Sequence, residues 1–244
     1  MRIAIAGATG LIGSRLTALA ESEGHEVVAI ARETGFDLLV GDGLDDALAG
    51  ADAVVDVTQS PTLDAQEASE FFETVAANLG GAAHRAEVGR TVVLSIVGAD
   101  KSPDYGYYVA KVAQEDAHRK LSPGAVVLRA TQFHEFAGQM IGWFTEGRTV
   151  SVMDVTTQPV DTAEIVRLLL DLATGARTGD TDLAGPRQEV LVEQVRELVR
   201  RGDQDLDVVA VPAVPSLAGG SMLPGPDALV RGITWREWLD RNAG

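Results

Sequence analysis

The sequence of 244 residues has the composition of an ordinary folded protein, with 45% hydrophobic and 23% charged residues. It contains no cysteine, which excludes disulfides, thiolate metal sites and cysteine nucleophiles. The formal net charge of −16 repels phosphate backbones and anionic membrane surfaces, so we expect neither nucleic acid nor a membrane as a partner. The first residues run directly into a glycine motif that a signal peptide does not need, which predicts a cytoplasmic protein.

Short β-branched runs alternate with amphipathic helical patterns through the first half of the chain. The predicted strands are residues 2–6, 25–31, 36–40, 53–57, 91–97 and 125–129. The predicted helical segments between them are residues 11–22, 44–49, 63–80 and 107–120. Strands that alternate with helices form a mainly parallel sheet with helices on both faces. The fold class is therefore predicted to be α/β, with a doubly wound, Rossmann-type parallel sheet.

The alternation loosens after about residue 131, and no linker or charge block separates this part from the first. Helices are predicted at residues 134–145, 161–174, 188–201 and 234–241, with a Pro/Gly-rich stretch at 212–226. Doubly wound folds place their substrate pocket over the open sheet. We therefore interpret residues 1–244 as a single domain, in which residues 131–244 form mainly a small substrate cap that is not independent.

Three glycines follow the first predicted strand and open the first predicted helix. Gly7 allows a tight turn, Gly10 lets the backbone approach a pyrophosphate, and Gly13 lets the helix pack closely on the strand. The anion then lies on free N–H groups at the positive end of the helix. Residues 1–130 are therefore predicted to be a dinucleotide-binding core. Its phosphate site is formed by Gly7, Thr9, Gly10, Leu11, Ile12 and Gly13.

The choice of dinucleotide depends on the end of the second predicted strand. An acidic residue there binds the ribose hydroxyls of NAD, whereas a cation suits the additional phosphate of NADP. Arg32 follows the apolar run directly, and Glu33 comes next. We favour NADP(H) with Arg32 at the ribose, and NAD(H) remains the alternative because Arg32 could instead be a surface arginine paired with Glu33.

All three tyrosines of the chain lie within residues 105–108, and Tyr107 and Lys111 form a Y-x-x-x-K motif. On a helix these two side chains share one face, and an ammonium lowers the pKa of a nearby phenol. Tyr107 could then protonate a carbonyl oxygen that Ser95 holds at the end of an apolar strand. Tyr108 is the alternative proton donor, and aromatic packing beside a solvated lysine is the structural alternative.

Residues after the last predicted parallel strand lie at the edge of the sheet where ligands gather. Gln132, Phe133 and His134 are there, and Trp143 lies in the cap, so these four are predicted to line a substrate pocket. His134 could orient a substrate or relay a proton, or be an ordinary satisfied polar side chain. The remaining histidines adjoin no carboxylate cluster with the spacing of metal ligands, so no metal site is expected.

In this order, the motifs resemble an atypical short-chain dehydrogenase/reductase of the NmrA-like, NAD(P)H-binding branch. The segments that carry the resemblance span nearly the whole chain: residues 7–13, 41–42, 94–98, 107–111, 128–133, 158–161, 183–186 and 235–239. The resemblance implies a Rossmann fold with Asp42 near the adenine and Lys111 at the nicotinamide ribose. It also implies that Thr58, Gln59 and Ser60 lie on the ribose–nicotinamide side. Ser95 is one residue closer to Tyr107 than is usual in short-chain enzymes.

Three functions follow from these observations. The leading hypothesis is an NADPH-dependent oxidoreductase that reduces a small carbonyl, quinone or conjugated substrate by hydride transfer, with proton donation by Tyr107 and Lys111. The second is an NADP(H)-sensing regulatory protein without turnover. The third, a sugar-nucleotide epimerase or dehydratase, ranks last because the cap is short for a second nucleotide. A homodimer through helices 63–80 and 107–120 is a further expectation.

Overall fold

The computed structural model describes residues 1–242, which gather in two compact units. The first unit comprises Met1–Ile96, Tyr105–Arg129 and Ile165–Thr181. The second comprises Val97–Asp104, Ala130–Glu164 and the chain from Asp182 onward. Every residue predicted to bind the dinucleotide lies in the first unit, and every residue predicted to line the substrate pocket lies in the second.

A parallel sheet forms the centre of the first unit, with the strand order β5-β4-β3-β1-β2. Its strands are β1 (Arg2–Ala6), β2 (Glu26–Ile30), β3 (Ala53–Asp56), β4 (Arg90–Ile96) and β5 (Ala125–Ala130). Ala6 is paired with Ile30 of β2 and with Asp56 of β3. The loops that follow β1, β2 and β3 therefore leave the sheet at one edge, which brings together segments far apart in the sequence.

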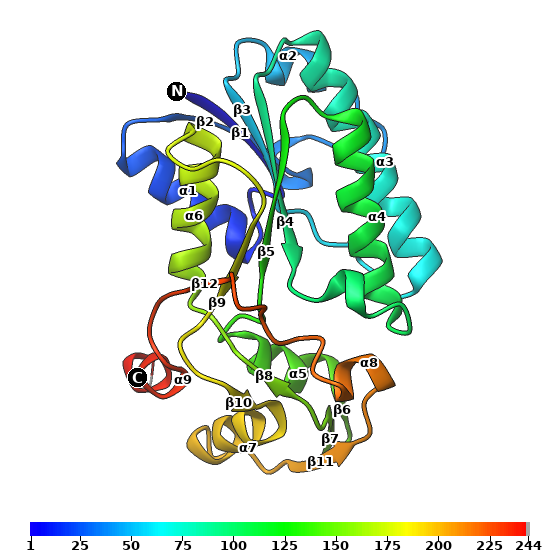
Figure 1. Ribbon diagram of the computed structural model, residues 1–244, viewed down its shortest axis with the longest axis vertical. Helices are drawn as coiled ribbons and strands as arrows, with labels where there is room; N and C mark the ends of the chain where they lie inside the picture. Colours follow the sequence, from blue (N-terminus) through cyan, green and yellow to red (C-terminus); the bar gives the residue numbers. More distant parts are fainter. Residues whose placement is uncertain (243–244) are drawn as a thin grey trace. The chain divides into compact units, whose positions relative to one another are not determined.

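Helices cover both faces of this sheet, which confirms the predicted doubly wound α/β fold (Figure 1). They are α1 (Leu11–Ser22), α2 (Leu44–Leu48), α3 (Ala65–Arg85), α4 (Gly106–Leu121) and α6 (Thr162–Thr174). α3 and α4 lie side by side on one face, and α1 and α6 on the other. Arg167 of α6 forms an ion pair with Glu23 at the end of α1, which links these two helices directly.

The contact between α3 and α4 depends on small residues. Phe72 of α3 packs with Ala68 and Ala110 in a fully buried cluster. Further along α3, a Cβ atom on Gly80 would collide with the carbonyl oxygen of Leu121 and would lie 2.8 Å from Ser122 Oγ. Glycine at position 80 therefore allows the end of α4 to approach the backbone of α3.

The predicted strand at residues 36–40 is wrong, because this segment forms turns. The Asp37 side chain accepts a hydrogen bond from the Leu39 N–H at 2.9 Å, and its carbonyl oxygen accepts the Gly41 N–H at 2.8 Å. Leu38 is buried, whereas Leu39 and Val40 are exposed, so burial does not alternate as it would in a half-buried strand. The other strands predicted in the first half are present with small shifts at their ends.

The second unit consists of short strands and helices. The order β11-β7-β6 forms one sheet, β8 pairs with β10, and β9 pairs in parallel with β12. Its strands are β6 (Thr145–Glu146), β7 (Thr149–Met153), β8 (Thr156–Thr157), β9 (Thr181–Ala184), β10 (Glu189–Val190), β11 (Asp207–Val211) and β12 (Leu229–Val230). Its helices are α5 (Phe136–Phe144), α7 (Leu191–Arg201), α8 (Pro215–Ala218) and α9 (Trp235–Arg241). Among the described helices, none combines the length and apolar character needed to cross a membrane.

Candidate cofactor site and active site

The glycine loop after β1 has the shape that the sequence predicts for a phosphate site. Gly7 has a φ of +82°, which favours glycine, and its N–H donates to the Ile30 carbonyl at 2.9 Å. A Cβ atom on Gly7 would lie 3.0 Å from the Val57 carbonyl oxygen, and one on Gly13 would collide with the carbonyl oxygen of Gly7. The loop therefore packs against both β3 and α1 in a way that only glycine permits at these positions.

The amino end of α1 is left open within the described chain. Gly10 occupies the N-cap position and supplies no side-chain hydrogen bond, and the first turn contains no acidic residue. Unpaired N–H groups at a helix start are satisfied by water or by an anion. The glycine loop, residues 7–13, thus forms a cradle that fits the pyrophosphate of a dinucleotide.

The two charged residues after β2 have different surroundings. Both lie in a short 3-10 turn, Arg32–Thr34. Thr9 Oγ1 donates to Glu33 Oε2 at 2.9 Å, and the pKa of the Glu33 carboxyl is lowered by its own backbone N–H and by Thr9. Arg32 is exposed, and its positive charge contributes to the lowered pKa of Glu33. The carboxylate is thus bound to the glycine loop, while the arginine is available to a ligand.

The loop after β3 contains three of the residues predicted to bind the cofactor, Thr58, Gln59 and Ser60. The Thr58 N–H donates to Asp56 Oδ1 at 2.9 Å, and Ser60 Oγ accepts the Thr62 N–H at 3.2 Å. Gln59 is exposed. Asp42 is also exposed, in the turn before α2. The contacts of Gly7 with Val57 and Thr58 place the start of this loop beside the glycine cradle.

Lys111 of α4 is almost completely buried, with 4% of its surface exposed. Its ammonium donates to the Leu94 carbonyl oxygen at 2.8 Å and to Gln114 Oε1, and it lies 4.7 Å from the centre of the Phe72 ring. Burial lowers the pKa of Lys111 to about 8, although the charges of Asp56 and Glu115 oppose this shift. The ammonium is therefore held between β4 and α3.

The tyrosines do not show the expected coupling to this lysine. The Tyr107 ring packs edge-on against Phe72, with 6.1 Å between ring centres. Burial, with the nearby Tyr105, raises the pKa of Tyr107 to about 12, so the predicted lowering by Lys111 is absent from this arrangement. Tyr108 is buried, and its ring packs edge-on against that of Tyr105 at 5.1 Å. Whether Tyr107 or Tyr108 donates the proton therefore stays a prediction.

Ser95 is the last residue but one of β4 and is 2% exposed. Its hydroxyl has no hydrogen-bond partner among the described residues. A buried hydroxyl without a partner is costly unless water or a ligand satisfies it. This observation suits the predicted role of Ser95 in holding a substrate oxygen.

A buried polar network that the sequence reading missed lies beside Lys111. Gln114 Nε2 donates to Asp56 Oδ2 at 2.7 Å, and His118 Nε2 donates to the same oxygen at 2.9 Å. His118 Nδ1 lies 2.8 Å from Ser122 Oγ. Burial alone would raise the pKa of Asp56, but the hydrogen bond and charge of His118, with the Thr58 hydrogen bonds, hold it well below its usual range. The contact of His118 with this single carboxylate, from a distant part of the chain, was not expected from the sequence.

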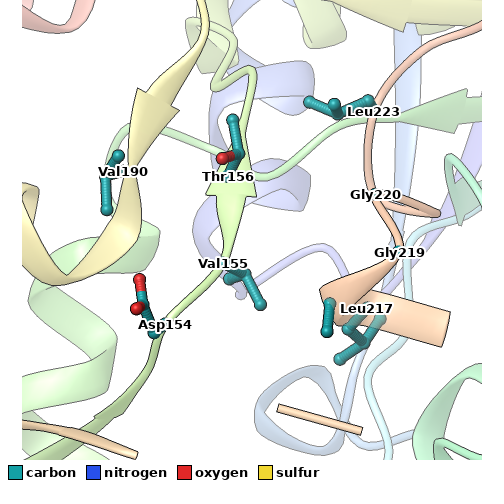
Figure 2. A pocket seen from close by; sticks show the side chains of 9 residues that line it. Asp154, Val155, Thr156, Val190, Leu217, Gly219, Gly220 and Leu223 are labelled. Atoms are coloured by element: carbon teal, nitrogen blue, oxygen red, sulfur yellow. The ribbon is translucent and has the colours of Figure 1, made fainter. Parts of the chain in front are cut away.

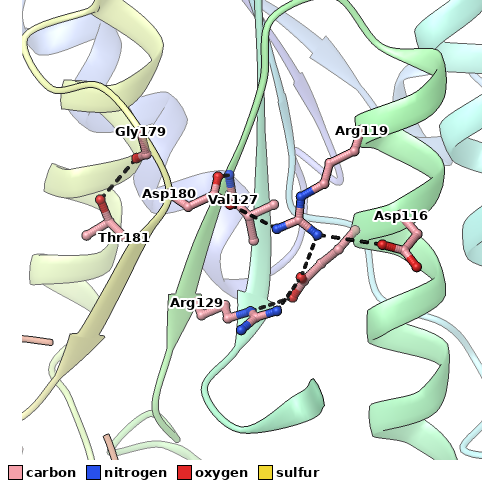
Figure 3. Close-up of polar contacts among 8 residues, drawn as sticks. Asp116, Arg119, Val127, Arg129, Gly179, Asp180 and Thr181 are labelled. Atoms are coloured by element: carbon pink, nitrogen blue, oxygen red, sulfur yellow. Dashed lines mark hydrogen bonds and ion pairs between the residues drawn. The ribbon is translucent and has the colours of Figure 1, made fainter. Parts of the chain in front are cut away.

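A second buried carboxylate, that of Glu115, lies on the same helix. Figure 3 shows the two arginines that bind it, Arg119 and Arg129. Arg129 of β5 donates to both of its oxygens, from Nε at 2.9 Å and from Nη2 at 2.7 Å. Arg119 donates to Glu115 at 3.2 Å and to Asp180 at 2.9 Å, and it lies 3.7 Å from Asp116. Glu115 is therefore held by two arginines, of which Arg119 also pairs with the exposed carboxylates of Asp116 and Asp180.

The residues predicted to line a substrate pocket have mixed surroundings in the second unit. His134 is fully buried, its Nε2 donates to the Ile233 carbonyl at 3.1 Å, and its ring lies 5.5 Å from that of Trp238. Burial lowers the pKa of His134, against the effect of the Ile233 carbonyl. Gln132 is 7% exposed and Phe133 forms an isolated bridge with Val160. Trp143 is 47% exposed.

The second unit contains a cavity of about 320 Å³. Figure 2 shows Asp154, Val155 and Thr156 along one segment, with Leu217 and Leu223 on another. The remaining lining residues are Val190, Ala218, Gly219 and Gly220. The cavity combines aliphatic walls with one carboxylate and one hydroxyl, and none of the four predicted pocket residues lines it. Within residues 1–242, no group of three His, Asp or Glu side chains is arranged to hold a metal ion.

Comparison with known proteins places this geometry among dinucleotide-binding folds. Residues 3–122 match the model of the NAD dependent epimerase/dehydratase family. No curated protein matches the chain.

Solved structures of similar fold cover nearly the whole chain at low sequence identity. The NADPH-dependent quinone oxidoreductase QOR2 of Escherichia coli, complexed with NADPH, has a TM-score of 0.76 and 16% identity, over 98% of this chain and 99% of that chain. The dTDP-4-dehydrorhamnose reductase of Bacillus anthracis, in complex with NADP, has a TM-score of 0.72 and 15% identity, over 98% and 97%. The UDP-N-acetylglucosamine 4-epimerase of Bacillus cereus has a TM-score of 0.67 and 16% identity, over 91% and 92%. Residues 3–122 thus carry the pattern of the NAD dependent epimerase/dehydratase family, on a Rossmann-like fold shared with NAD(P)-binding reductases and epimerases.

Proposed function

We propose that the protein is an NADPH-dependent reductase of a small carbonyl, quinone or conjugated substrate. The observation that carries the proposal is the uncapped glycine cradle beside an exposed Arg32, while Thr9 engages the neighbouring Glu33. An exposed guanidinium suits the additional phosphate of NADP, and a carboxylate already bound to the glycine loop is less available to ribose hydroxyls. The family match and the NADPH-bound quinone oxidoreductase of similar fold support the same assignment.

The residues of the chain would divide the chemistry as follows. NADPH supplies the hydride when it is bound. The glycine cradle and Arg32 hold the phosphates, and Lys111 binds the nicotinamide ribose, as the short-chain dehydrogenase/reductase resemblance implies. Tyr107, whose pKa of about 12 keeps it protonated at neutral pH, donates a proton to the substrate oxygen. Ser95 holds that oxygen with its unpartnered hydroxyl.

One observation favours a second candidate, a regulatory protein that binds NADP(H) without turnover. The Lys111 ammonium is engaged by Leu94, Gln114 and the Phe72 ring, and the pKa of Tyr107 is raised rather than lowered. Tyr107 and Lys111 are therefore not arranged for proton transfer. The NmrA-like resemblance includes members of this kind. A sugar-nucleotide epimerase or dehydratase is the third candidate, supported by the family match and by the epimerase of similar fold.

The test is the consumption of NADPH and NADH against a panel of quinones, ketones and enones. We expect turnover with NADPH that falls by at least about 100-fold in Tyr107→Phe, because general acid catalysis contributes about 10²–10⁴-fold. Binding of NADPH, followed by its fluorescence, should persist in this variant.

Tyr108→Phe is the matched control, because it removes a hydroxyl from the adjacent residue of the same helix. Turnover that survives in Tyr107→Phe but not in Tyr108→Phe would move the proton donor to Tyr108. Tight NADPH binding without turnover of any compound would favour the regulatory protein.

A further inference from the structure

One buried carboxylate is linked to two separate parts of the proposed cofactor site, to one directly and to the other through a glutamine. Asp56 is fully buried at the end of β3, and its Oδ1 accepts the Thr58 N–H at 2.9 Å. Its Oδ2 accepts Gln114 Nε2 at 2.7 Å, and Gln114 Oε1 in turn accepts the Lys111 ammonium. The loop after β3 is therefore bonded to this carboxyl group directly, and the lysine of α4 is linked to it through Gln114.

The chemistry of the three groups determines how the central amide is oriented. An ammonium can only donate hydrogen bonds, and a carboxylate can only accept them. The Gln114 amide therefore has its oxygen towards Lys111 and its NH₂ group towards Asp56. A glutamine that is fully buried between these partners cannot rotate its amide without breaking both hydrogen bonds.

Burial destabilises the charged form of Lys111, and two carboxylates oppose this effect. Asp56 at the end of β3 and Glu115 on α4 are the charged groups that act on it. The other elements packed against the ammonium contribute the Leu94 carbonyl of β4 and the Phe72 ring of α3. The charge of Glu115 is itself compensated by arginines, which leaves Asp56 as the stronger support for the ammonium.

Asp56 is in turn held in place from the far end of α4. His118 is fully buried and donates from Nε2 to Asp56 Oδ2, and Ser122 contacts the other ring nitrogen. The polar residues Lys111, Gln114 and His118 recur at helical spacing, so they form one row along α4, and Ser122 follows as its C-cap residue. Within this row, Gln114 and His118 donate directly to the carboxylate of Asp56.

We propose that Asp56 is the positioning residue of this site, which acts through Gln114 to keep Lys111 protonated and in place, and through Thr58 to fix the loop after β3. The inference rests on the proposed function for the role of Lys111 at the cofactor. Asp56 itself is not assigned a contact with cofactor or substrate. Its effect is transmitted by the amide of Gln114 and by the Thr58 backbone.

The test follows the titration of Lys111 in the protein without cofactor. The chain has only three lysines, Lys101, Lys111 and Lys120, so protein labelled with ¹³C-lysine gives few Cε signals by NMR. In the wild-type protein we expect one signal to titrate at about pH 8, and Lys111→Met identifies it by its loss. In Asp56→Asn this midpoint should fall by about one pH unit or more, because an opposite charge at this range shifts a pKa by about 1–3 units.

Asp116→Asn is the matched control, because it makes the same chemical change in an exposed carboxylate of α4. It should leave the Lys111 midpoint unchanged. An unchanged midpoint in folded Asp56→Asn overturns the inference. If Asp56→Asn does not fold, Gln114→Met breaks the link while it retains the charge of Asp56, and an unchanged midpoint in that variant overturns the inference as well.

Binding of NADPH at different pH values provides the second readout. We expect wild-type affinity to weaken as the pH rises through the Lys111 midpoint, and this weakening should begin at lower pH in Asp56→Asn. The two proposals fail separately. Absence of NADPH binding to the wild-type protein contradicts the proposed function but leaves the lysine titration interpretable, whereas binding with an unaltered lysine midpoint contradicts only the role of Asp56.

Discussion

The two buried carboxylates next to α4, those of Asp56 and Glu115, are held in opposite ways. Both are fully buried. Glu115 is bound by the guanidinium groups of Arg129 and Arg119, which are permanent cations. Asp56 is bound by an amide, an imidazole and a backbone N–H, and the nearest lysine is reached only through Gln114.

This difference indicates which of the two carboxylates has the larger effect on the protonation of Lys111. A carboxylate paired with two guanidinium groups has little net field left, and its contribution is mainly to hold α4 against β5. Asp56 is held by His118, an amide and a backbone N–H, and of the two carboxylates it has the larger effect on the pKa of Lys111. We therefore expect substitutions at Glu115 to affect mainly stability, and those at Asp56 to affect mainly the state of Lys111.

The largest effect on stability is expected for Glu115→Gln. The substitution leaves the partly buried guanidinium of Arg129 opposite an amide, and breaking a buried pair from one side costs about 3–5 kcal/mol. Urea denaturation should show this loss in the free energy of unfolding. The Lys111 midpoint should move less than in Asp56→Asn, and an equal or larger movement would contradict the distinction between the two carboxylates.

A smaller effect should appear in the pH dependence of stability. The pKa of Lys111 is about 8 in the folded protein and 10.5 as the reference, so between these values the unfolded chain binds more protons. The free energy of unfolding should therefore gain about 2 kcal/mol between pH 8 and 10 from this residue. Denaturation of wild-type and Lys111→Met protein across this range measures it. A rise of the same size in both proteins would show that it does not arise from Lys111.

The smallest effect is expected for Arg119→Ala. Its side chain is 39% exposed and its partners include the exposed Asp116 and Asp180, so we expect a loss below about 1 kcal/mol. Urea denaturation at low and high salt tests this, because an exposed ion pair weakens with ionic strength. A loss as large as that of Glu115→Gln would assign the support of Glu115 to Arg119 instead of Arg129.

Much of the fold was predictable because its signals are local. The glycine spacing and the short apolar runs identified the cradle after β1 and the parallel strands, since each depends on a few consecutive residues. The turns at residues 36–40 were missed because the Asp37 side chain competes with strand pairing. The comparisons support the dinucleotide fold, while the roles of Ser95 and Tyr107 stay predictions.

The Asp56 network could not be predicted from spacing alone. Asp56 and His118 are 62 residues apart, and only the packing of α4 on the sheet brings them together. A signal was present, because Lys111, Gln114 and His118 are polar residues at helical spacing in a helix that also buries Ala110. Polar residues on the buried side of a helix require partners. The sequence does not identify those partners, because they lie on a distant strand.

Gly80 limits which substitutions this sequence can accept during evolution. It has no chemistry of its own, yet it allows the end of α4, with Ser122, to lie against α3. Ser122 contacts His118, which contacts Asp56. A side chain at position 80 would therefore disturb a carboxylate that it never touches. Natural selection on the chemistry around Asp56 should constrain this remote glycine, and variation at position 80 should be tolerated only together with compensating changes at the end of α4.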